Sequence, residues 1–224
     1  MVRSLHADTF NHDEDATGYD ADVVDESGPI RAGYQATLDW VVERAAIRAD
    51  ESVLDLGIGT GNLAARLPPC GRLVGVDVSE RMLERASGKL GPSVELVQAD
   101  LLEVLAGPSD AAADSDASGH LDVIVSTYAI HHLTAGEKET LIVAAAQRLA
   151  PGGRFVVGDL MVAGRAAVAD VRARLAHPDV DDLFADEFPW YVDESLTAMA
   201  AAGFTALAAE QVSDLSWGLA ARRR

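Results

Sequence analysis

Three glycines stand close together in the stretch VLDLGIGTGNLAARL, from Val53 to Leu67. Gly57, Gly59 and Gly61 directly follow a short hydrophobic run, as glycines do where a buried strand turns sharply and a ligand approaches the backbone. A carboxylate comes next: Asp77 ends the run RLVGVD, 20 residues after Gly57. A carboxylate at the end of a second strand accepts hydrogen bonds from the two hydroxyls of a ribose. The two features together predict a site for a nucleoside ligand.

The glycine spacing narrows the choice of nucleoside. The pattern is G-x-G-x-G, whereas dinucleotide-binding loops have G-x-G-x-x-G, and Asn62 stands where their third glycine would be. That third glycine serves the packing of a helix whose N-terminus receives a pyrophosphate. The sequence therefore disfavours a nicotinamide dehydrogenase and favours a nucleoside without a pyrophosphate.

Candidate acid-base groups follow the fourth and fifth expected strands. Tyr128, His131 and His132 come after LDVIVST, and Asp159 lies in RFVVGDL. Histidine is the usual general base near neutral pH, although a His-His-Leu sequence also ends a loop and caps the next helix. No metal site is expected, because adjacent histidines on a loop point apart and no H-x-x-x-H or H-x-H spacing is present.

Composition limits the classes of partner. The chain of 224 residues has 36 acidic and 18 basic residues, and its net charge of −18 disfavours nucleic acid. No apolar run reaches the ~20 residues of a membrane span, no secretory leader is evident, and one cysteine suits a reducing compartment. We expect a cytoplasmic protein, a monomer or homodimer, that binds a small molecule and no membrane.

The elements that must position these residues alternate between strand and helix. Strands are expected at SVLDLG, 72–77, 94–100, LDVIVSTYAI, 154–160, 204–212 and 214–221, and helices at 34–47, NLAARL, 80–90, 134–150 and 193–202. This order predicts an α/β fold, a Rossmann-like doubly wound sheet of seven strands with the last strand antiparallel and helices on both faces. Ser79 is the expected N-cap of the third of these helices, and the segment 106–120 is expected to be a mobile loop.

Two further segments are expected to cover the site: one precedes the domain of residues 34–224, and the other lies within it. Residues 1–33 are polar and acidic and form an N-terminal arm, expected to act as a lid over the cofactor. Residues 161–192 interrupt the alternation and are expected to act as a substrate lid. They hold the aromatics Phe184, Phe188, Trp190 and Tyr191. An aromatic cage beside carboxylates suits a cationic or amphipathic substrate, and a purely structural packing cluster is the alternative.

Three consecutive motifs carry a family resemblance. VLDLGIGTG, GVDVSERML and VQADLLEV resemble the ordered motifs of class I S-adenosylmethionine-dependent methyltransferases, over about residues 34–160, and IVSTYAIHHLT resembles small bacterial members whose substrate is often unassigned. The resemblance implies S-adenosylmethionine as methyl donor and S-adenosylhomocysteine as product.

The resemblance also assigns roles within the cofactor site. Asp55 with the backbone of Gly57 and Gly59 would hold the methionine end, and Asp77 the ribose. Val78 would lie against the adenine, Asp100 would accept from its amino group, and the Leu101 backbone would meet the ring edge. The remaining residues assigned to this site are Tyr19 of the arm, Gly61, Met82 and Ser126.

The resemblance leaves three functions open. The first is methyl transfer to a small-molecule acceptor, with His131, His132, Tyr128 or Asp159 as catalytic group. The second is cleavage of another sulfonium bond, by aminocarboxypropyl transfer or cyclisation with release of methylthioadenosine. The third is a non-catalytic cofactor-binding module.

Overall fold

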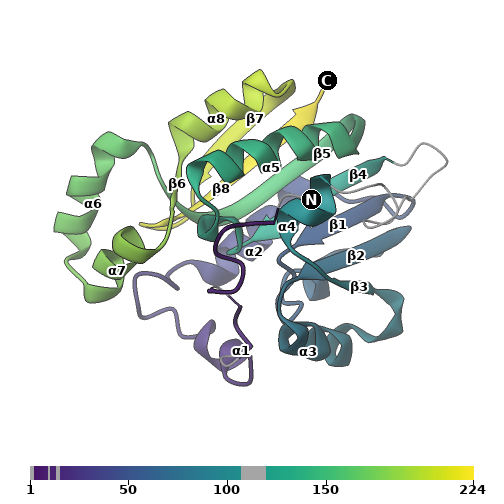
Figure 1. The fold of residues 1–224 in the computed structure, drawn as a ribbon, viewed down its shortest axis with the longest axis horizontal. Coiled ribbons are helices and arrows are strands. Elements are labelled where there is room, and N and C mark those ends of the chain that lie inside the picture. The colour runs from purple at the N-terminus through teal and green to yellow at the C-terminus, as the bar shows by residue number, and fades with distance from the viewer. Residues whose placement is uncertain (1–2, 10, 14–15, 107–119) are drawn as a thin grey trace.

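The fold is built on one twisted sheet (Figure 1). We describe residues 3–9, 11–13, 16–106 and 120–224 of a computed structural model. The loop expected at 106–120 lies almost wholly outside these residues. The strands are β1 (Ser52–Leu56), β2 (Arg72–Asp77), β3 (Glu95–Gln98), β4 (Leu121–Thr127), β5 (Leu149–Val162), β7 (Phe204–Gln211) and β8 (Ser216–Arg223).

The strands are ordered β3-β2-β1-β4-β5-β8-β7. Strands β1 to β5 pair in parallel, whereas β8 pairs antiparallel with both β5 and β7. The prediction of seven strands with the last one antiparallel is confirmed, and a two-residue strand, β6 (Trp190–Tyr191), pairs with β5 in addition. The strand order reverses between β1 and β4, where doubly wound sheets bind ligands at their carboxyl edge.

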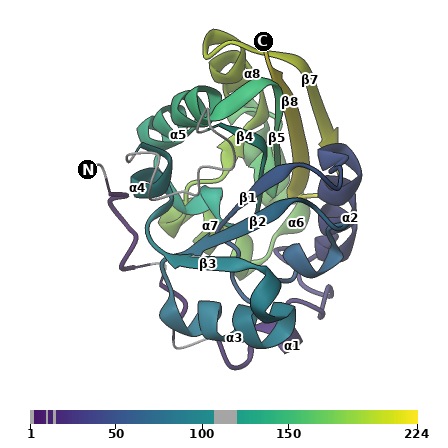
Figure 2. The ribbon, with the colours of Figure 1, turned by 90° about the vertical axis from the view of Figure 1, so that its right-hand side faces the viewer.

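Helices cover both faces of the sheet (Figure 2). Helices α4 (Leu101–Ala106), α5 (Ala135–Arg148) and α8 (Val192–Ala201) pack on one face, and α2 (Tyr34–Ala45) and α3 (Glu80–Leu90) on the other. Strand β1 is buried on both sides. Leu54 and Leu56 pack in the hydrophobic cluster under α4, α5 and α8, and Val53 packs in the cluster under α2 and α3. The expected doubly wound architecture is therefore present.

Local signals set several boundaries. The Ser79 side chain accepts a hydrogen bond from Met82 N at 3.0 Å, which confirms the predicted N-cap of α3. The helix predicted at NLAARL was wrong in extent, since only a 3₁₀ turn, Ala64–Arg66, forms there. Pro68 and Pro69 follow this turn. Because the helical conformation is disfavoured for the residue before a proline, Leu67 is extended and the helix ends after one turn.

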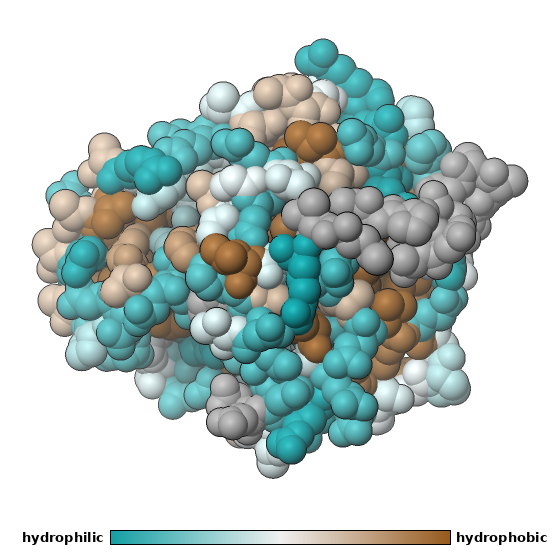
Figure 3. Space-filling view, in the orientation of Figure 1, coloured by the Kyte–Doolittle hydropathy of each residue, from teal (hydrophilic) through white to brown (hydrophobic). Residues whose placement is uncertain are grey.

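The N-terminal arm and residues 161–192 both contain short helices. The arm carries α1 (Tyr19–Asp22), and residues 161–192 carry α6 (Val168–Leu175), α7 (Pro178–Asp186) and β6. Within the described part of the chain, every helix is too short or too polar to cross a bilayer. The face seen in Figure 3 is largely hydrophilic, with apolar residues in separate patches.

Candidate functional site

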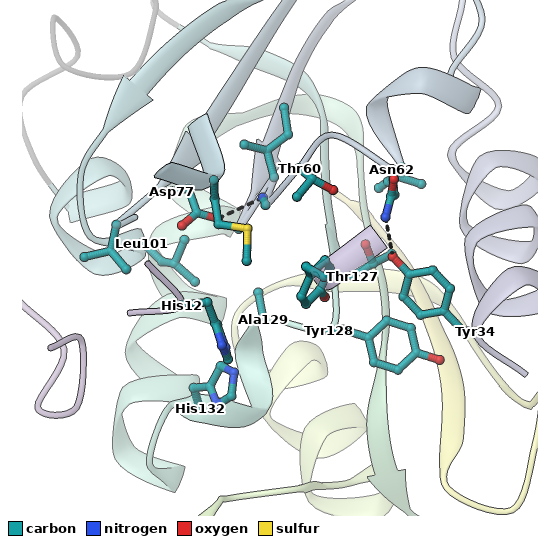
Figure 4. Close-up of a pocket in the computed structure, with 17 residues that line it drawn as sticks. His12, Tyr34, Thr60, Asn62, Asp77, Leu101, Thr127, Tyr128, Ala129 and His132 are labelled. Carbon is teal, nitrogen blue, oxygen red and sulfur yellow. Dashed lines mark hydrogen bonds between the residues drawn. The ribbon is translucent and has the colours of Figure 1, made fainter. Parts of the chain in front are cut away.

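A cavity opens at the carboxyl ends of β1, β2 and β4 (Figure 4). Of the residues that the sequence assigned to a site, nine line it: Tyr19, Gly57, Gly59, Asp77, Val78, Met82, Leu101, Tyr128 and His132. Residues that the sequence did not single out also line it, among them His12, Tyr34, Thr60, Asn62 and Thr127. The tertiary structure thus brings the glycine loop, the end of β2 and the loop after β4 together.

The glycine loop passes close to its neighbours at one point and faces open space at another. Gly57 has a φ of +72°, and a Cβ there would collide with the Cβ of Ala129. Gly59 has a φ of +53° and no atom within 4 Å of the position of a Cβ. Both backbone angles favour glycine, and the open side of Gly59 leaves room for a ligand against the main chain.

The Asp77 carboxylate is fixed by the backbone around it. Gly59 N donates to its Oδ2 at 2.8 Å, and Ser79 N donates to its Oδ1 at 2.9 Å. Burial raises the pKa of Asp77, and these backbone hydrogen bonds oppose that rise. Each carboxylate oxygen retains a lone pair after accepting one bond, so Asp77 can accept two hydroxyl groups of a ligand.

Asp55 on β1 is a buried acid that no group of the described chain satisfies. It is 1% exposed, and neither of its oxygens has a hydrogen-bond partner. Burial, together with the charge of Asp77, raises its pKa to about 8. A buried carboxyl without a partner costs free energy. A cationic ligand group reaching Asp55 would remove that cost.

The N-terminal arm closes one side of the cavity. Asp20 accepts hydrogen bonds from Thr60 Oγ1 at 2.5 Å and from Asn62 Nδ2 at 3.1 Å, and its other oxygen lies 2.9 Å from Lys89 Nζ. The same Asn62 amide donates to the Tyr34 hydroxyl at 3.1 Å, as Figure 4 shows. The residue that replaces the third dinucleotide glycine is thus the polar link between loop and arm. In the sequence Asn62 stands out only as the residue in place of a glycine, because nothing there pairs it with Asp20.

Four residues assigned to the cofactor site lie outside the cavity lining: the buried Asp55 of β1, and Gly61, Asp100 and Ser126. Asp100 caps α4, with Oδ1 accepting from Leu102 N at 2.9 Å, and both of its oxygens also accept from Ser4 of the arm. Ser126 is buried and donates to Leu56 O at 2.7 Å. A Cβ on Gly61 would come within 2.9 Å of Leu90, so this glycine permits the loop to pack on α3. Thr127 rather than Ser126 reaches the cavity.

Tyr128 lies at the cavity in an unusual backbone conformation. Its φ is +49°, in a region that non-glycine residues seldom occupy except at special sites. The hydroxyl lies 2.9 Å from Ser216 Oγ and donates to Thr37 Oγ1 at 3.2 Å. Burial raises the pKa of Tyr128 to about 12. At neutral pH the phenol therefore keeps its proton and holds three elements together.

The two histidines have different surroundings. His132 lines the cavity, with its ring 5.6 Å from that of His12 (Figure 4), and burial holds its pKa well below the usual value. His131 lies behind it, 4.0 Å from His132 between ring centroids, and its Nδ1 lies 2.5 Å from Asp159 Oδ1. Asp159 is fully buried and also accepts from the backbone N of Ile130 and His131. The predicted catalytic groups are thus adjacent, but only His132 and Tyr128 border the cavity.

A second cavity of about 270 Å³ lies beyond these histidines. It is lined by the four aromatics singled out in the sequence, Phe184, Phe188, Trp190 and Tyr191, and by Lys138, Glu187 and neighbours on α5 and α8. Lys138 donates to the backbone carbonyls of Leu133 and Phe188, and burial lowers its pKa to about 8. Glu187 borders this cavity and contacts His131, and His131 packs on His132 of the first cavity.

The sequence of this chain is similar to those of known methyltransferases. A family model described as a methyltransferase domain matches residues 53–153. An uncharacterized methyltransferase of Geobacillus kaustophilus is 32% identical over 206 residues, 90% of this chain and 87% of the relative, and one of Geobacillus thermodenitrificans is 34% identical over the same shares.

Solved structures agree at the level of the fold. A magnesium protoporphyrin IX methyltransferase of Synechocystis PCC 6803 with bound S-adenosylhomocysteine has a TM-score of 0.68 and 18% identity, over 98% of this chain and 99% of that one. A possible histamine N-methyltransferase of Thermotoga maritima has a TM-score of 0.64 and 15% identity, over 95% and 98% of the two chains.

Proposed function

This chain belongs to the class I S-adenosylmethionine-dependent methyltransferases, and we propose that it transfers the methyl group of that cofactor to a small-molecule acceptor. S-adenosylmethionine, when bound, supplies a methyl group already activated on a sulfonium. The protein then has to orient the two reactants and exclude water.

The buried Asp55, with its two unpartnered oxygens, carries the proposal. The methionine end of S-adenosylmethionine bears an ammonium group, and a buried carboxylate of raised pKa becomes stable when a cation reaches it. Asp77, already oriented by Gly59 N and Ser79 N, would accept the ribose hydroxyls. Val78, Met82 and Leu101 line the adjoining part of the cavity and would contact the adenine. The residues present therefore fit the cofactor that the family uses.

The acceptor side is best assigned to the part of the cavity bordered by His132, His12 and Thr127. The second cavity is lined by aromatic rings, with Glu187 and Glu194 at its border. Aromatic faces and carboxylates suit an amphipathic or cationic molecule. Residues 161–192 supply much of this lining, which supports a role for them as a substrate lid.

Analysis of the products tests the proposal. The purified protein is incubated with S-adenosylmethionine, with and without a small-molecule extract of its source, and the adenosyl products are identified by mass spectrometry. We expect S-adenosylhomocysteine to accumulate only with extract, and one extract component to gain a methyl group. Asp77→Ala, expected to bind the cofactor more weakly, should form less product at the same cofactor concentration.

Two other outcomes would contradict methyl transfer. Methylthioadenosine formed without extract would show that another sulfonium bond is cleaved. Tight binding of S-adenosylmethionine, with no product under any condition, would instead indicate a non-catalytic module.

A further inference from the structure

His131 has a carboxylate against each of its ring nitrogens. Nδ1 lies 2.5 Å from Asp159 Oδ1, and Nε2 lies 3.3 Å from Glu187 Oε2. Asp159 is 0% exposed, and its second oxygen is held by two backbone N–H groups. A carboxylate fixed in this way accepts a hydrogen bond from Nδ1–H, and the second ring nitrogen, Nε2, then faces Glu187. A lone pair and a carboxylate oxygen at that separation repel each other unless a cation lies between them.

The imidazole of His132 lies at the same point in the fold, beside the ring of His131. Ligand atoms of His131, His132 and Glu187 all lie within 4.8 Å of one another. Glu187 follows the end of α7, where its N–H donates to Leu183 O at 3.2 Å. The next residue, Phe188, donates its N–H to His131 O at 3.0 Å. Backbone hydrogen bonds therefore hold the glutamate beside the histidine turn, so the cluster is fixed on both sides.

We propose that His131 Nε2, the Glu187 carboxylate and a ring nitrogen of His132 bind one divalent transition-metal ion of the zinc type, with Asp159 positioning His131. Two imidazoles and one carboxylate are a ligand set of catalytic zinc sites, which keep a fourth position for water or substrate. A carboxylate on the far nitrogen of a metal-binding histidine is the usual support for such a ligand.

The distances suit this ion. Zinc lies about 2.0–2.1 Å from imidazole nitrogen and carboxylate oxygen, so two ligands of a tetrahedral site are roughly 3.3–3.4 Å apart. The His131 Nε2 to Glu187 Oε2 distance of 3.3 Å already has this value. The His132 ring must approach by a small side-chain rotation, since the three ligand atoms are spread over at most 4.8 Å. The sequence expectation of no metal site considered His131, His132 and Asp159, whereas the third ligand of the proposed site comes from Glu187.

The position of the site indicates what the metal does. His132 lines the cofactor cavity, so the fourth position lies beside the place proposed for the acceptor. A divalent cation lowers the pKa of a bound hydroxyl or thiol, and the acceptor then loses its proton to water before it is methylated. This last step, unlike metal binding itself, rests on the proposed methyl transfer, and it narrows the acceptor to a hydroxyl or a thiol.

Zinc binding by the untagged, chelator-treated full-length protein tests the site. Zn²⁺ is titrated against a chromophoric chelator, with thermal unfolding of every variant recorded to establish that it folds. We expect one equivalent of tightly bound zinc, and at least a tenfold loss of affinity in His131→Ala and in Glu187→Gln. His177→Ala, a histidine outside the cluster that pairs with Asp179, is the matched control and should bind zinc as the wild type does.

Asp159→Asn separates positioning from ligation. Asparagine keeps one acceptor oxygen but loses the negative charge and the second acceptor, so this change should weaken zinc binding by about 10–100-fold, the range for the loss of such a supporting group. Cobalt substitution gives an independent readout, because the visible absorption of bound Co²⁺ reports a four-coordinate nitrogen and oxygen site in the wild type and should be lost in His131→Ala.

The rival occupant of the gap is a proton shared by His131 and Glu187. It predicts that ¹⁵N resonances of His131 show both ring nitrogens protonated and unchanged by zinc, with wild type and His131→Ala binding zinc equally weakly. That result overturns the proposal. Calorimetry of S-adenosylmethionine binding to the same metal-free protein measures the proposed function separately, so either idea can fail while the other stands.

Discussion

Thr60 of the glycine loop donates a 2.5 Å hydrogen bond to Asp20 of the N-terminal arm. Lys89 on α3 adds an ion pair to the same carboxylate at 2.9 Å. Residues 40 positions apart in sequence are therefore joined at the edge of the cavity, and the arm is tied to the loop that we propose meets the cofactor.

Loosening this tie should weaken cofactor binding. In Asp20→Asn the ion pair is lost and the bond from Thr60 becomes neutral. Because Asp20 is about half exposed, we expect a loss of only about 1 kcal/mol, or roughly fivefold in affinity. Calorimetry with S-adenosylhomocysteine measures it. Asp8→Asn, which changes an exposed acid of the same arm that pairs with Arg3, is the control, and an equal loss there would point to general charge rather than this contact.

Asp77→Ala should have a larger effect on the same affinity. The carboxylate would lose charge-assisted hydrogen bonds to the ribose, worth ~1.5–3 kcal/mol, or about 10- to 150-fold. Two backbone N–H groups would also lose their acceptor, so thermal unfolding is recorded beside calorimetry. Asp50→Ala, an exposed acid in the turn before β1, is the matched control. Unchanged affinity in a folded Asp77→Ala protein would remove Asp77 from the site.

Asp55 should make the stability of the free protein depend on pH. Its pKa is raised to about 8 by burial and by Asp77, against roughly 4 in an unfolded chain. Between these values the folded state holds a proton that the unfolded state has released, so stability falls as pH rises. The slope is at most about 1.4 kcal/mol per pH unit between pH 4 and 8. Urea unfolding at several pH values measures it, and Asp55→Asn should flatten the dependence.

The same acid should release a proton when the cofactor binds. At pH 7 Asp55 is mostly protonated, and a cationic ligand favours its ionised form. Calorimetry in buffers of different ionisation enthalpy should therefore detect up to one proton released, and affinity should rise with pH toward 8. Release that persists in Asp55→Asn would locate the titrating group elsewhere.

Tyr128→Phe should reduce stability and leave catalysis unchanged. The phenol hydrogen-bonds to Thr37 and Ser216, and with a pKa of about 12 it does not act as a base at neutral pH. We expect a loss of about 1 kcal/mol in the free energy of unfolding and a methyl-transfer rate within twofold of wild type. A rate that falls a hundredfold in the folded variant would restore Tyr128 to the catalytic group.

The sequence by itself determined the sheet and the cofactor loop. Alternating strand and helix patterns predicted the doubly wound fold, and Ser79 was correctly identified as the cap of α3, because periodicity and capping are local properties of the chain. Gly57, Gly59 and Asp77 were predicted to share a site because they follow strands whose ends must meet at one edge, and all three line one cavity.

The tertiary structure alone decided which distant side chains meet. Asp20 with Asn62, and Glu187 with His131, come from segments whose sequence separation carries no pairing signal. It also decided that Asp100 and Ser126 do not line the cavity. Asp100 accepts hydrogen bonds from the arm and from α4, and Ser126 donates to a backbone carbonyl. Burial in the folded protein sets the pKa values at the site. The pKa of Asp55 and that of Tyr128 are raised mainly by loss of solvent, which depends on how all the elements pack.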